Sequence, residues 1–234
     1  MIAHVGIVIP ARDEVELIRR CLDSVVGAAS VARAHSRVQV SVIVIADACA
    51  DDTAAVARAF EGVIVHEVSG ANVGIARATG SRIALDLGCS WLAHTDADSV
   101  VPSNWVTEQL RLAAAGCDVV IGTVRPDFDD LSTAHVAQWH ATHLPGQPNG
   151  HVHGANLGVR ASTYLAVGGF DALPEHEDNE LVTRLTAAGA AIVASDAAEV
   201  ITSGRLVGRT AGGYAGHLRR IADELASAPR AVSA

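Results

Sequence analysis

Residues 91–99 read WLAHTDADS, a short apolar run followed by two acidic residues. The run Trp91–His94 predicts a buried strand, and Asp96 and Asp98 come directly after it. Two carboxylates at positions i and i+2 of an extended backbone point to the same side, where one hard cation can contact both. Aspartate is also favoured in turns and at helix starts, so this stretch needs support from the rest of the chain.

Strands and helices alternate on both sides of this stretch. We expect strands at residues 5–9, 38–45, 63–68, 91–94, 119–124, 153–160 and 190–194. We expect helices after Asp13, which can serve as an N-cap, and at residues 51–60, 75–87, 102–115, 177–188 and 212–226. This alternation is typical of an α/β fold with right-handed crossovers and a mostly parallel sheet that helices cover on both faces. Ligands of such sheets bind at the carboxyl ends of strands, where this chain carries its polar clusters.

Residues 125–150 depart from this pattern. Pro126, Pro145 and Pro148 lie there among several histidines and acids, around one short helical stretch near residues 134–140. Long irregular segments of a compact domain are usually functional, so we expect this segment to contribute to a binding site.

The composition argues against several classes of protein. A formal net charge of −9 and a pI near 5.6 argue against nucleic acid as a partner, because nucleic-acid-binding domains usually carry a basic surface. The four cysteines are widely spaced, which predicts neither a zinc site nor a disulfide framework and fits a reducing cytoplasm. No signal peptide is recognisable, and no apolar stretch reaches the ~18 residues of a membrane span. We therefore expect a soluble cytoplasmic protein with no integral membrane segment, for which a peripheral position at a membrane stays open.

Several segments together carry a resemblance to one known family. In chain order they read VGIVIPARDE (5–14), VIADACADDT (44–53), NVGIARATG (72–80), TDADS (95–99), GANLGVRASTYLAVGGFD (154–171) and EDNELVTRL (177–185). In this order and spacing the chain resembles the family 2 glycosyltransferases of the GT-A fold over nearly all of its length. The resemblance implies a single GT-A domain over residues 1–234. Its first half, residues 1–124, would bind a nucleotide-diphosphate sugar, and residues 125–234 would bind the acceptor.

The resemblance implies which residues contact the nucleoside of the donor, for which UDP is the expected nucleotide. Pro10 and Ala11 would lay their backbone against the nucleobase. Glu14 would lie near the ribose or the base, and Asp47 would accept a hydrogen bond from the base. The alternative for Glu14 is a solvated acid favoured by the helix dipole, and for Asp47 a turn residue.

The resemblance also implies how the diphosphate is held. Asp98 would be the direct ligand of Mg²⁺ or Mn²⁺, and Asp96 would bind the ribose or a metal-bound water. Such an ion stabilises the charge that develops on the leaving diphosphate. Asn72 and Arg77 would face the diphosphate or hold the metal-site loop, while the alternative for Arg77 is an exposed helix residue.

The acceptor half contains the implied catalytic base. The pair Glu177-Asp178 matches an acidic pair of the family, so Asp178 would take the proton of the acceptor hydroxyl, with Glu177 as its neighbour or as an acceptor ligand. Acids at a helix N-terminus are also stabilised by the helix dipole alone. The other implied residues are Gly154, Ala155 and Asn156 in the sugar and acceptor pocket, and Arg205 and Arg209, which would contact the diphosphate or equally be solvated at the surface. His151 and His153, at positions i and i+2, lack the further ligands of a zinc site and are interpreted as residues of the pocket rim.

We therefore expect an inverting, metal-dependent hexosyltransferase that moves one sugar to an unknown hydroxyl of a small-molecule or lipid-linked acceptor. The Q-x-x-R-W signature of processive synthases is absent, which favours a single addition. One alternative is a sugar-phosphate nucleotidyltransferase, but residues 10–14 read PARDE, where that chemistry needs a glycine-rich, basic loop. Another is a non-catalytic protein that binds a nucleotide sugar, because fold and motif do not prove activity.

Overall fold

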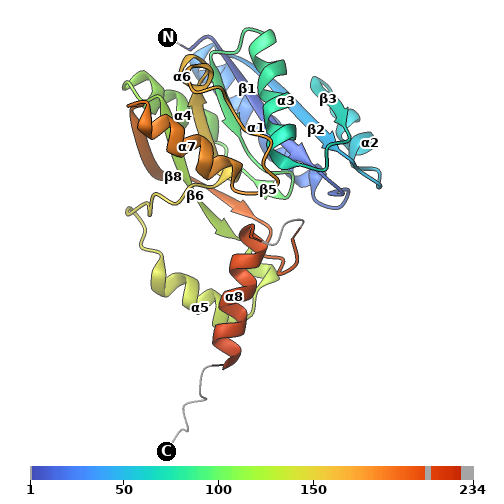
Figure 1. Cartoon of the computed structure of the whole chain (residues 1–234), viewed down its shortest axis with the longest axis vertical. Helices are drawn as coiled ribbons and strands as arrows, with labels where there is room; N and C mark the ends of the chain where they lie inside the picture. Colours follow the sequence, from blue (N-terminus) through green and yellow to red (C-terminus); the bar gives the residue numbers. More distant parts are fainter. Residues whose placement is uncertain (1, 209–211, 228–234) are drawn as a thin grey trace, which may run out of the picture.

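The chain is built around one eight-stranded sheet (Figure 1). The structure is a computed structural model that describes residues 2–208 and 212–227. Across the sheet the strands follow the order β3-β2-β1-β4-β7-β6-β8-β5. Their bounds are β1 His4–Ala11, β2 Gln39–Asp47, β3 Val63–Val68, β4 Trp91–His94, β5 Ser99–Val100, β6 Val119–Pro126, β7 Leu157–Arg160 and β8 Ile192–Thr202.

The sheet is mixed and mostly parallel, which confirms the predicted α/β fold class. β1 is parallel to β2 and β4, β2 is parallel to β3, and β6 is parallel to β8. β7 runs antiparallel between β4 and β6, and β5 pairs antiparallel with β8. In β1, Ile7 and Ile9 belong to the core on one face of the sheet and Val8 to the core on the other. Because both faces are covered, the strand reads as an unbroken apolar run.

Helices cover the two faces in separate sets. α1, α2 and α4 pack on the face that carries Ile7, and α3, α6 and α7 pack on the face that carries Val8. Within the described part of the chain, no helix is both long and apolar enough to cross a membrane. The bounds are α1 Ile18–Ser36, α2 Thr53–Arg58, α3 Val73–Asp86, α4 Trp105–Ala114, α6 Ala161–Ala166 and α7 Glu177–Ala187.

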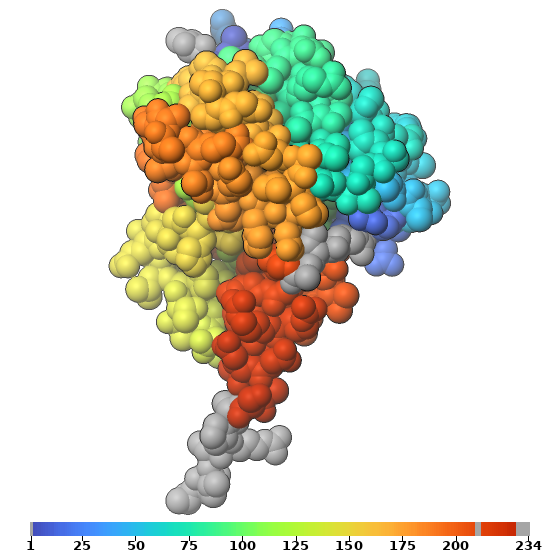
Figure 2. All heavy atoms as spheres, in the orientation of Figure 1, coloured from blue at the N-terminus to red at the C-terminus, as the bar shows by residue number. Residues whose placement is uncertain are grey.

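Two further helices lie beyond one end of the sheet. α5 (Thr133–Thr142) forms within the segment that departs from the alternating pattern, and α8 (Tyr214–Ser227) contacts it. Figure 1 shows this pair beyond the carboxyl ends of β6 and β8. In Figure 2 the same two segments, yellow and red, form the narrow lower part of the molecule. They bound the space next to the strand ends.

Three predicted boundaries are wrong. Asp13 does not cap a helix, because α1 begins only at Ile18 and the Asp13 Oδ1 accepts the Ala50 N–H at 2.7 Å, with a left-handed φ of 51°. The predicted strand at 153–160 opens instead with a 3-10 turn at Gly154–Asn156, so β7 has only four residues. β8 continues well past residue 194, because it pairs with β6 and β5, which are distant in sequence.

Gly74 allows the two halves of the chain to approach each other closely. It lies in the first turn of α3, and its N–H donates to the Leu173 carbonyl at 3.0 Å. A methyl group on Gly74 would lie 2.7 Å from Leu173 N and still closer to Asp171 O. Both neighbours are backbone atoms, so a larger side chain requires a shift of the main chain.

We predict that Gly74→Ala lowers the free energy of unfolding by about 1–3 kcal/mol through this overpacking. The measurement is urea denaturation followed by circular dichroism. The matched control is Gly27→Ala in α1, where an added methyl group meets no heavy atom within 4 Å. That change should be neutral or stabilise by up to about 1 kcal/mol, because alanine favours the helix. Equal losses in the two variants would contradict the close approach at Gly74.

Candidate active site

A cavity of about 910 Å³ opens where β1 and β2 end and extends to α5 and α8. It gathers residues that lie far apart in the sequence. The residues that the resemblance implies at the nucleotide and the metal all line this cavity: Pro10, Ala11, Glu14, Asp47, Asn72, Arg77, Asp96 and Asp98. Seven residues singled out in the second half of the chain also line the cavity: Gly154, Ala155, Glu177, Asp178, Arg205 and the two histidines expected at the rim, His151 and His153.

One implied residue that the structure describes is not part of this lining. Asn156 is only 2% exposed, and its Oδ1 accepts the indole N–H of Trp105 at 2.8 Å. Its Nδ2 donates to the carbonyls of Thr123 and Ala198 at 2.9 Å each. The amide therefore joins α4, β6 and β8 inside the protein, and it is not oriented toward a ligand in the cavity. Arg209 lies outside the described residues.

Arg77 forms the centre of a buried ion-pair network. It is 2% exposed, its Nε donates to Glu177 Oε1 at 2.8 Å, and its Nη2 donates to Asp96 Oδ1 at 2.5 Å. Burial opposes the charge of Arg77, but Asp96 and Glu177 outweigh burial and raise the pKa of Arg77. A Cβ on Gly154 would collide with the guanidinium, so only glycine fits there. The exposed-helix alternative for Arg77 is wrong, and the residue holds the loop that carries Asp96.

Asp98 lies in a second ion-pair network at the cavity. Its side chain is 14% exposed, Oδ1 accepts the Thr202 hydroxyl at 3.2 Å, and Oδ2 lies 2.9 Å from Arg205 Nη2. The same guanidinium forms two hydrogen bonds with the Glu14 carboxylate, at 2.6 and 2.9 Å. Burial and the nearby Asp96 raise the pKa of Asp98 to about 6. Glu14 is also buried, so the alternative of a solvated acid is wrong.

The donor set at this point suits a divalent cation that arrives with phosphates. Asp96 and Asp98 offer carboxylate oxygens, which Mg²⁺ and Mn²⁺ prefer. Among the described residues these two aspartates do not form part of a three-ligand cluster. Mg²⁺ is typically held by one or two carboxylates, with substrate phosphates and water as the other ligands. The residues present therefore fit such an ion, and each of the two carboxylates is paired with an arginine, Asp96 with Arg77 and Asp98 with Arg205.

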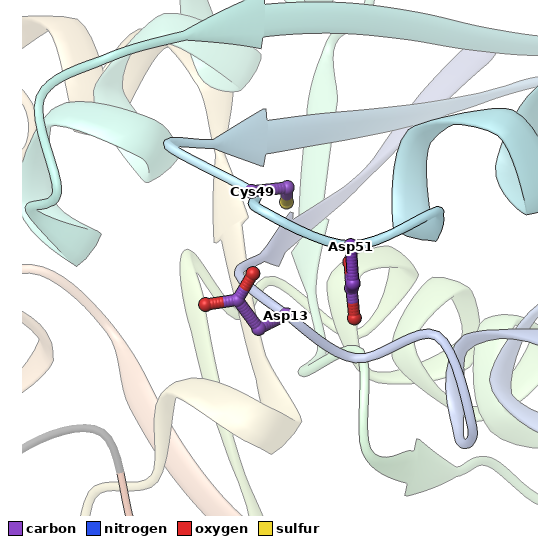
Figure 3. A group of neighbouring side chains, drawn as sticks. All are labelled: Asp13, Cys49 and Asp51. Atoms are coloured by element: carbon purple, nitrogen blue, oxygen red, sulfur yellow. The ribbon is translucent and has the colours of Figure 1, made fainter.

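Asp13, Cys49 and Asp51 form the three-residue cluster that the described part of the chain does contain (Figure 3). Their potential ligand atoms lie within 4.8 Å of one another. Asp13 Oδ1 accepts the N–H of Ala50, and Asp51 Oδ2 accepts the N–H of Val15 at 3.1 Å. Burial raises the pKa of the Cys49 thiol, which disfavours the thiolate that a metal would need. The cluster therefore joins the loops that follow β1 and β2.

Asp47 orders the loop that leads into α3. It is buried at the end of β2, and its two carboxylate oxygens accept the N–H groups of Ala71 and Asn72 at 2.7 and 2.6 Å. Asn72 in turn caps α3, because its Oδ1 accepts the Ile75 N–H at 3.0 Å. Asp47 thus has a structural function at the nucleotide end of the cavity, alongside the base contact that the resemblance implies.

Asp178 faces the cavity from the N-terminal turn of α7. His176, two residues before Asp178, has a left-handed φ of 62°, and α7 starts directly after it. Asp178 Oδ2 accepts the Gly154 N–H at 2.7 Å, and Oδ1 accepts the Asn179 N–H at 2.8 Å. These bonds fix the carboxylate next to Gly154, while the adjacent Glu177 turns to Arg77. The two members of the acidic pair therefore have different partners, the Arg77 guanidinium for Glu177 and backbone N–H groups for Asp178.

The far wall of the cavity contains aromatic residues that sequence reasoning did not single out. Trp139 of α5 and His143, which directly follows that helix, stack with ring centroids 4.2 Å apart. Tyr214 of α8 lies edge-on to His153 at 5.8 Å, and burial lowers the pKa of His153 to about 4. The available signal was the i, i+4 spacing of Trp139 and His143 within a segment already expected to be functional.

We predict that Arg77→Gln lowers the free energy of unfolding by about 3–5 kcal/mol, because it leaves the buried Glu177 carboxylate without this cation. Urea denaturation measures the loss. The control is Arg82→Gln, which removes an exposed ion pair with Asp86 on α3 and should have little effect. Similar stabilities of the two variants would mean that the Arg77 network is not essential to the fold.

Comparison with known proteins identifies relatives of this arrangement. The family model described as Glycosyl transferase family 2 matches residues 6–173. The chain is similar to S. aureus TarS 1-349, with a TM-score of 0.64 and 12% identity over 86% of this chain and 60% of that one. It is also similar to the mannosyltransferase PcManGT from Pyrobaculum calidifontis, solved with GDP-Man and Mn²⁺. That match has a TM-score of 0.66 and 20% identity over 92% of this chain and 60% of that one.

A third similar structure is S. aureus TarS 1-349 in complex with UDP-GlcNAc, with a TM-score of 0.65 and 10% identity over 95% of this chain and 66% of that one. The chain therefore spans about three fifths of the first two of these relatives. No curated protein sequence matches it. At such low identities the solved structures show a shared fold, whereas the family model covers most of the sequence, including the strand ends that line the cavity. The chain therefore belongs to glycosyl transferase family 2.

Proposed function

We propose that this protein transfers a single sugar from a nucleotide-diphosphate sugar to an acceptor hydroxyl, with inversion and with the help of a divalent cation. The observation that carries the proposal is the shared cavity. It is lined by Asp47, Arg77, Asp98 and Asp178, which come from four separate segments of the chain. Family membership makes glycosyl transfer the expected chemistry, and the cavity contains side chains suited to each part of it.

The donor is proposed to bind across the ends of β1 and β2. Pro10 and Ala11 line the cavity there next to Asp47, and a nucleobase would lie against their backbone. PcManGT was solved with GDP-Man and TarS with UDP-GlcNAc, so relatives of this fold accept different nucleotides. We propose UDP as the first candidate for this chain, with the sugar a hexose.

The diphosphate is proposed to lie at Asp96 and Asp98. A bound Mg²⁺ or Mn²⁺ would supply Lewis-acid stabilisation of the negative charge on the departing nucleoside diphosphate. Asp98 would hold that ion directly. Asp96, kept in place by Arg77, would orient the ribose or a water on the ion. The arginines at this rim provide the remaining positive charge in a chain whose formal net charge is −9.

Asp178 is proposed to be the general base. One of its carboxylate oxygens would accept the proton of the acceptor hydroxyl while that oxygen forms a bond to the anomeric carbon of the sugar. The bond from the anomeric carbon to the diphosphate oxygen breaks at the opposite face, and the electron pair leaves with the nucleoside diphosphate. The N–H of Gly154, 2.7 Å from Asp178 Oδ2, holds the base in position for this attack.

The acceptor is proposed to enter between α5 and α8. Trp139, His143 and Tyr214 line the same cavity as Asp178. Aromatic walls with a few polar groups are typical of small-molecule sites. We propose that residues 125–234 form the acceptor-binding half, with a small-molecule or lipid-linked hydroxyl compound as the acceptor.

A donor screen tests the proposal. UDP-, GDP- and dTDP-sugars are added with and without Mn²⁺, and thermal stability and release of the nucleoside diphosphate are measured. Specific binding to the native state should raise the melting temperature by linkage, and only with Mn²⁺. Slow hydrolysis should accompany binding. Stabilisation without turnover in the presence of an acceptor panel would indicate a non-catalytic nucleotide-sugar-binding protein, and no stabilisation by any donor would contradict the proposal.

Asp98→Asn should abolish metal-dependent donor binding, because the amide supplies a neutral and weaker ligand. We expect the affinity for the donor in Mn²⁺ to fall by about 100-fold or more, since even supporting residues of metal sites often contribute 10–100-fold. Isothermal titration calorimetry measures this change. The matched control is Asp86→Asn on the exposed face of α3, which should bind the donor normally. Unchanged affinity in Asp98→Asn would refute the metal assignment.

Asp178→Asn should leave donor binding largely intact and reduce turnover by about 10²–10⁴-fold, the usual contribution of a general base. The expected result is an unchanged dissociation constant with a lower rate of nucleoside diphosphate release. Full turnover by this variant would show that another group takes the proton.

A further inference from the structure

Arg205 lies where the cation of the proposed function would bind. It follows β8, and its Nη2 lies 2.9 Å from Asp98 Oδ2 and 2.6 Å from Glu14 Oε1. Its Nη1 donates to Glu14 Oε2 at 2.9 Å. The guanidinium therefore bridges the proposed metal ligand and a second buried carboxylate.

A guanidinium and a divalent cation on the same Asp98 oxygen would compete, because both are positive and both would lie within about 3 Å of it. Mg²⁺ approaches a carboxylate oxygen to about 2.1 Å and requires near-octahedral space around it. Arg205 Nη2 already lies within hydrogen-bond distance of Asp98 Oδ2 and carries the same sign of charge. The two cations repel each other at this separation, most strongly where water is excluded.

We propose that Arg205 substitutes for the divalent cation at Asp98 in the ligand-free protein and exchanges with it when the cation binds. Arg205 is then a positioning residue, since it acts on the reaction through Asp98. The inference rests on the proposed function, from which it takes Asp98 as the metal ligand. It adds that binding of the cation is coupled to release of the Arg205 side chain from Asp98.

The surrounding contacts limit what can move. Asp98 also accepts hydrogen bonds from Thr202 Oγ1 and, at its carbonyl, from Ser203 N, both at 3.2 Å. Gly204 N donates to Asp130 Oδ2 at 2.8 Å. The backbone is thus anchored up to residue 204, and the change is confined to the Arg205 side chain and the residues that follow it.

The residues after Arg205 have few packing contacts to lose. Leu206 is 36% exposed and Val207 is 75% exposed, although both are apolar. Movement of this stretch therefore costs little buried apolar surface. Release from Asp98 removes one of the two carboxylates that hold the guanidinium, so the Arg205 side chain is held less tightly once the cation is bound.

The first test measures binding of Mn²⁺ alone, without nucleotide, by electron paramagnetic resonance or calorimetry. Arg205→Gln should bind Mn²⁺ about tenfold more tightly than the wild type, because the ion no longer displaces a charge-assisted hydrogen bond. Arg205→Lys keeps the positive charge but loses the planar guanidinium, so its affinity for Mn²⁺ should lie between those of the wild type and Arg205→Gln. Arg111→Gln should bind Mn²⁺ as the wild type does. Equal or weaker binding by Arg205→Gln would indicate a purely structural role and overturn the exchange.

The second test uses the wild-type protein and does not depend on the folding of a variant. Trypsin cleaves after an arginine only when that side chain can enter the protease, so the engaged Arg205 should protect the bond to Leu206. Mn²⁺ should accelerate cleavage at this bond and leave cleavage after the exposed Arg58 unchanged. A cleavage rate that does not respond to saturating Mn²⁺ would overturn the exchange.

These results separate the inference from the proposed function. If the wild type and Arg205→Gln bind Mn²⁺ equally well and the donor is turned over, only the exchange fails. If the exchange is observed but no donor is turned over, only the catalytic proposal fails. If neither protein binds Mn²⁺ even with a nucleoside diphosphate present, the metal assignment fails and the exchange fails with it.

Discussion

One buried guanidinium, that of Arg77, joins the parts of the active-site rim. Its carboxylate partners, Asp96 and Glu177, come from the loop after β4 and from the start of α7. A buried charge is tolerated only when it is paired, so this position fixes both partners at once. The absent side chain of Gly154 makes room for the guanidinium, and the N–H of the same glycine holds Asp178. The proposed metal site and the proposed base therefore share one support.

The second constraint on the rim is electrostatic. A chain with a formal net charge of −9 gathers Glu14, Asp96 and Asp98 at one cavity, where their mutual repulsion must be offset. Arg77 and Arg205 provide that offset in the ligand-free protein. A divalent cation that enters with a diphosphate would add both positive and negative charge, so the rim can accept the pair with a rearrangement of Arg205 alone. The balance between acidic and basic side chains at the rim thus connects the observed ion pairs with the proposed binding of a cation and a diphosphate.

Much of the arrangement was predictable from local pattern. Each strand whose apolar run is closed by polar residues was recognised, and the polar residues that follow β1, β2 and β4 do meet at the cavity. The predictions that failed depended on partners elsewhere in the chain. Asp13 looks like an N-cap but accepts a hydrogen bond from Ala50 in the next loop. Asn156 looks like a pocket residue, but its side-chain amide forms hydrogen bonds with Trp105, Thr123 and Ala198 inside the protein.

By itself the sequence determined the α/β class, the family resemblance and the gathering of acids at strand ends, because apolar periodicity and residue order act over short distances along the chain. Only the tertiary structure decided which acid does what. Glu177 and Asp178 are neighbours with the same chemistry, but one is paired with the Arg77 guanidinium and the other accepts the N–H of Gly154. Arg205 was expected at the diphosphate, and only the fold shows that it pairs with Asp98 and Glu14. Charge interactions depend on distance in space and on burial, and neither of these can be read from separation along the chain.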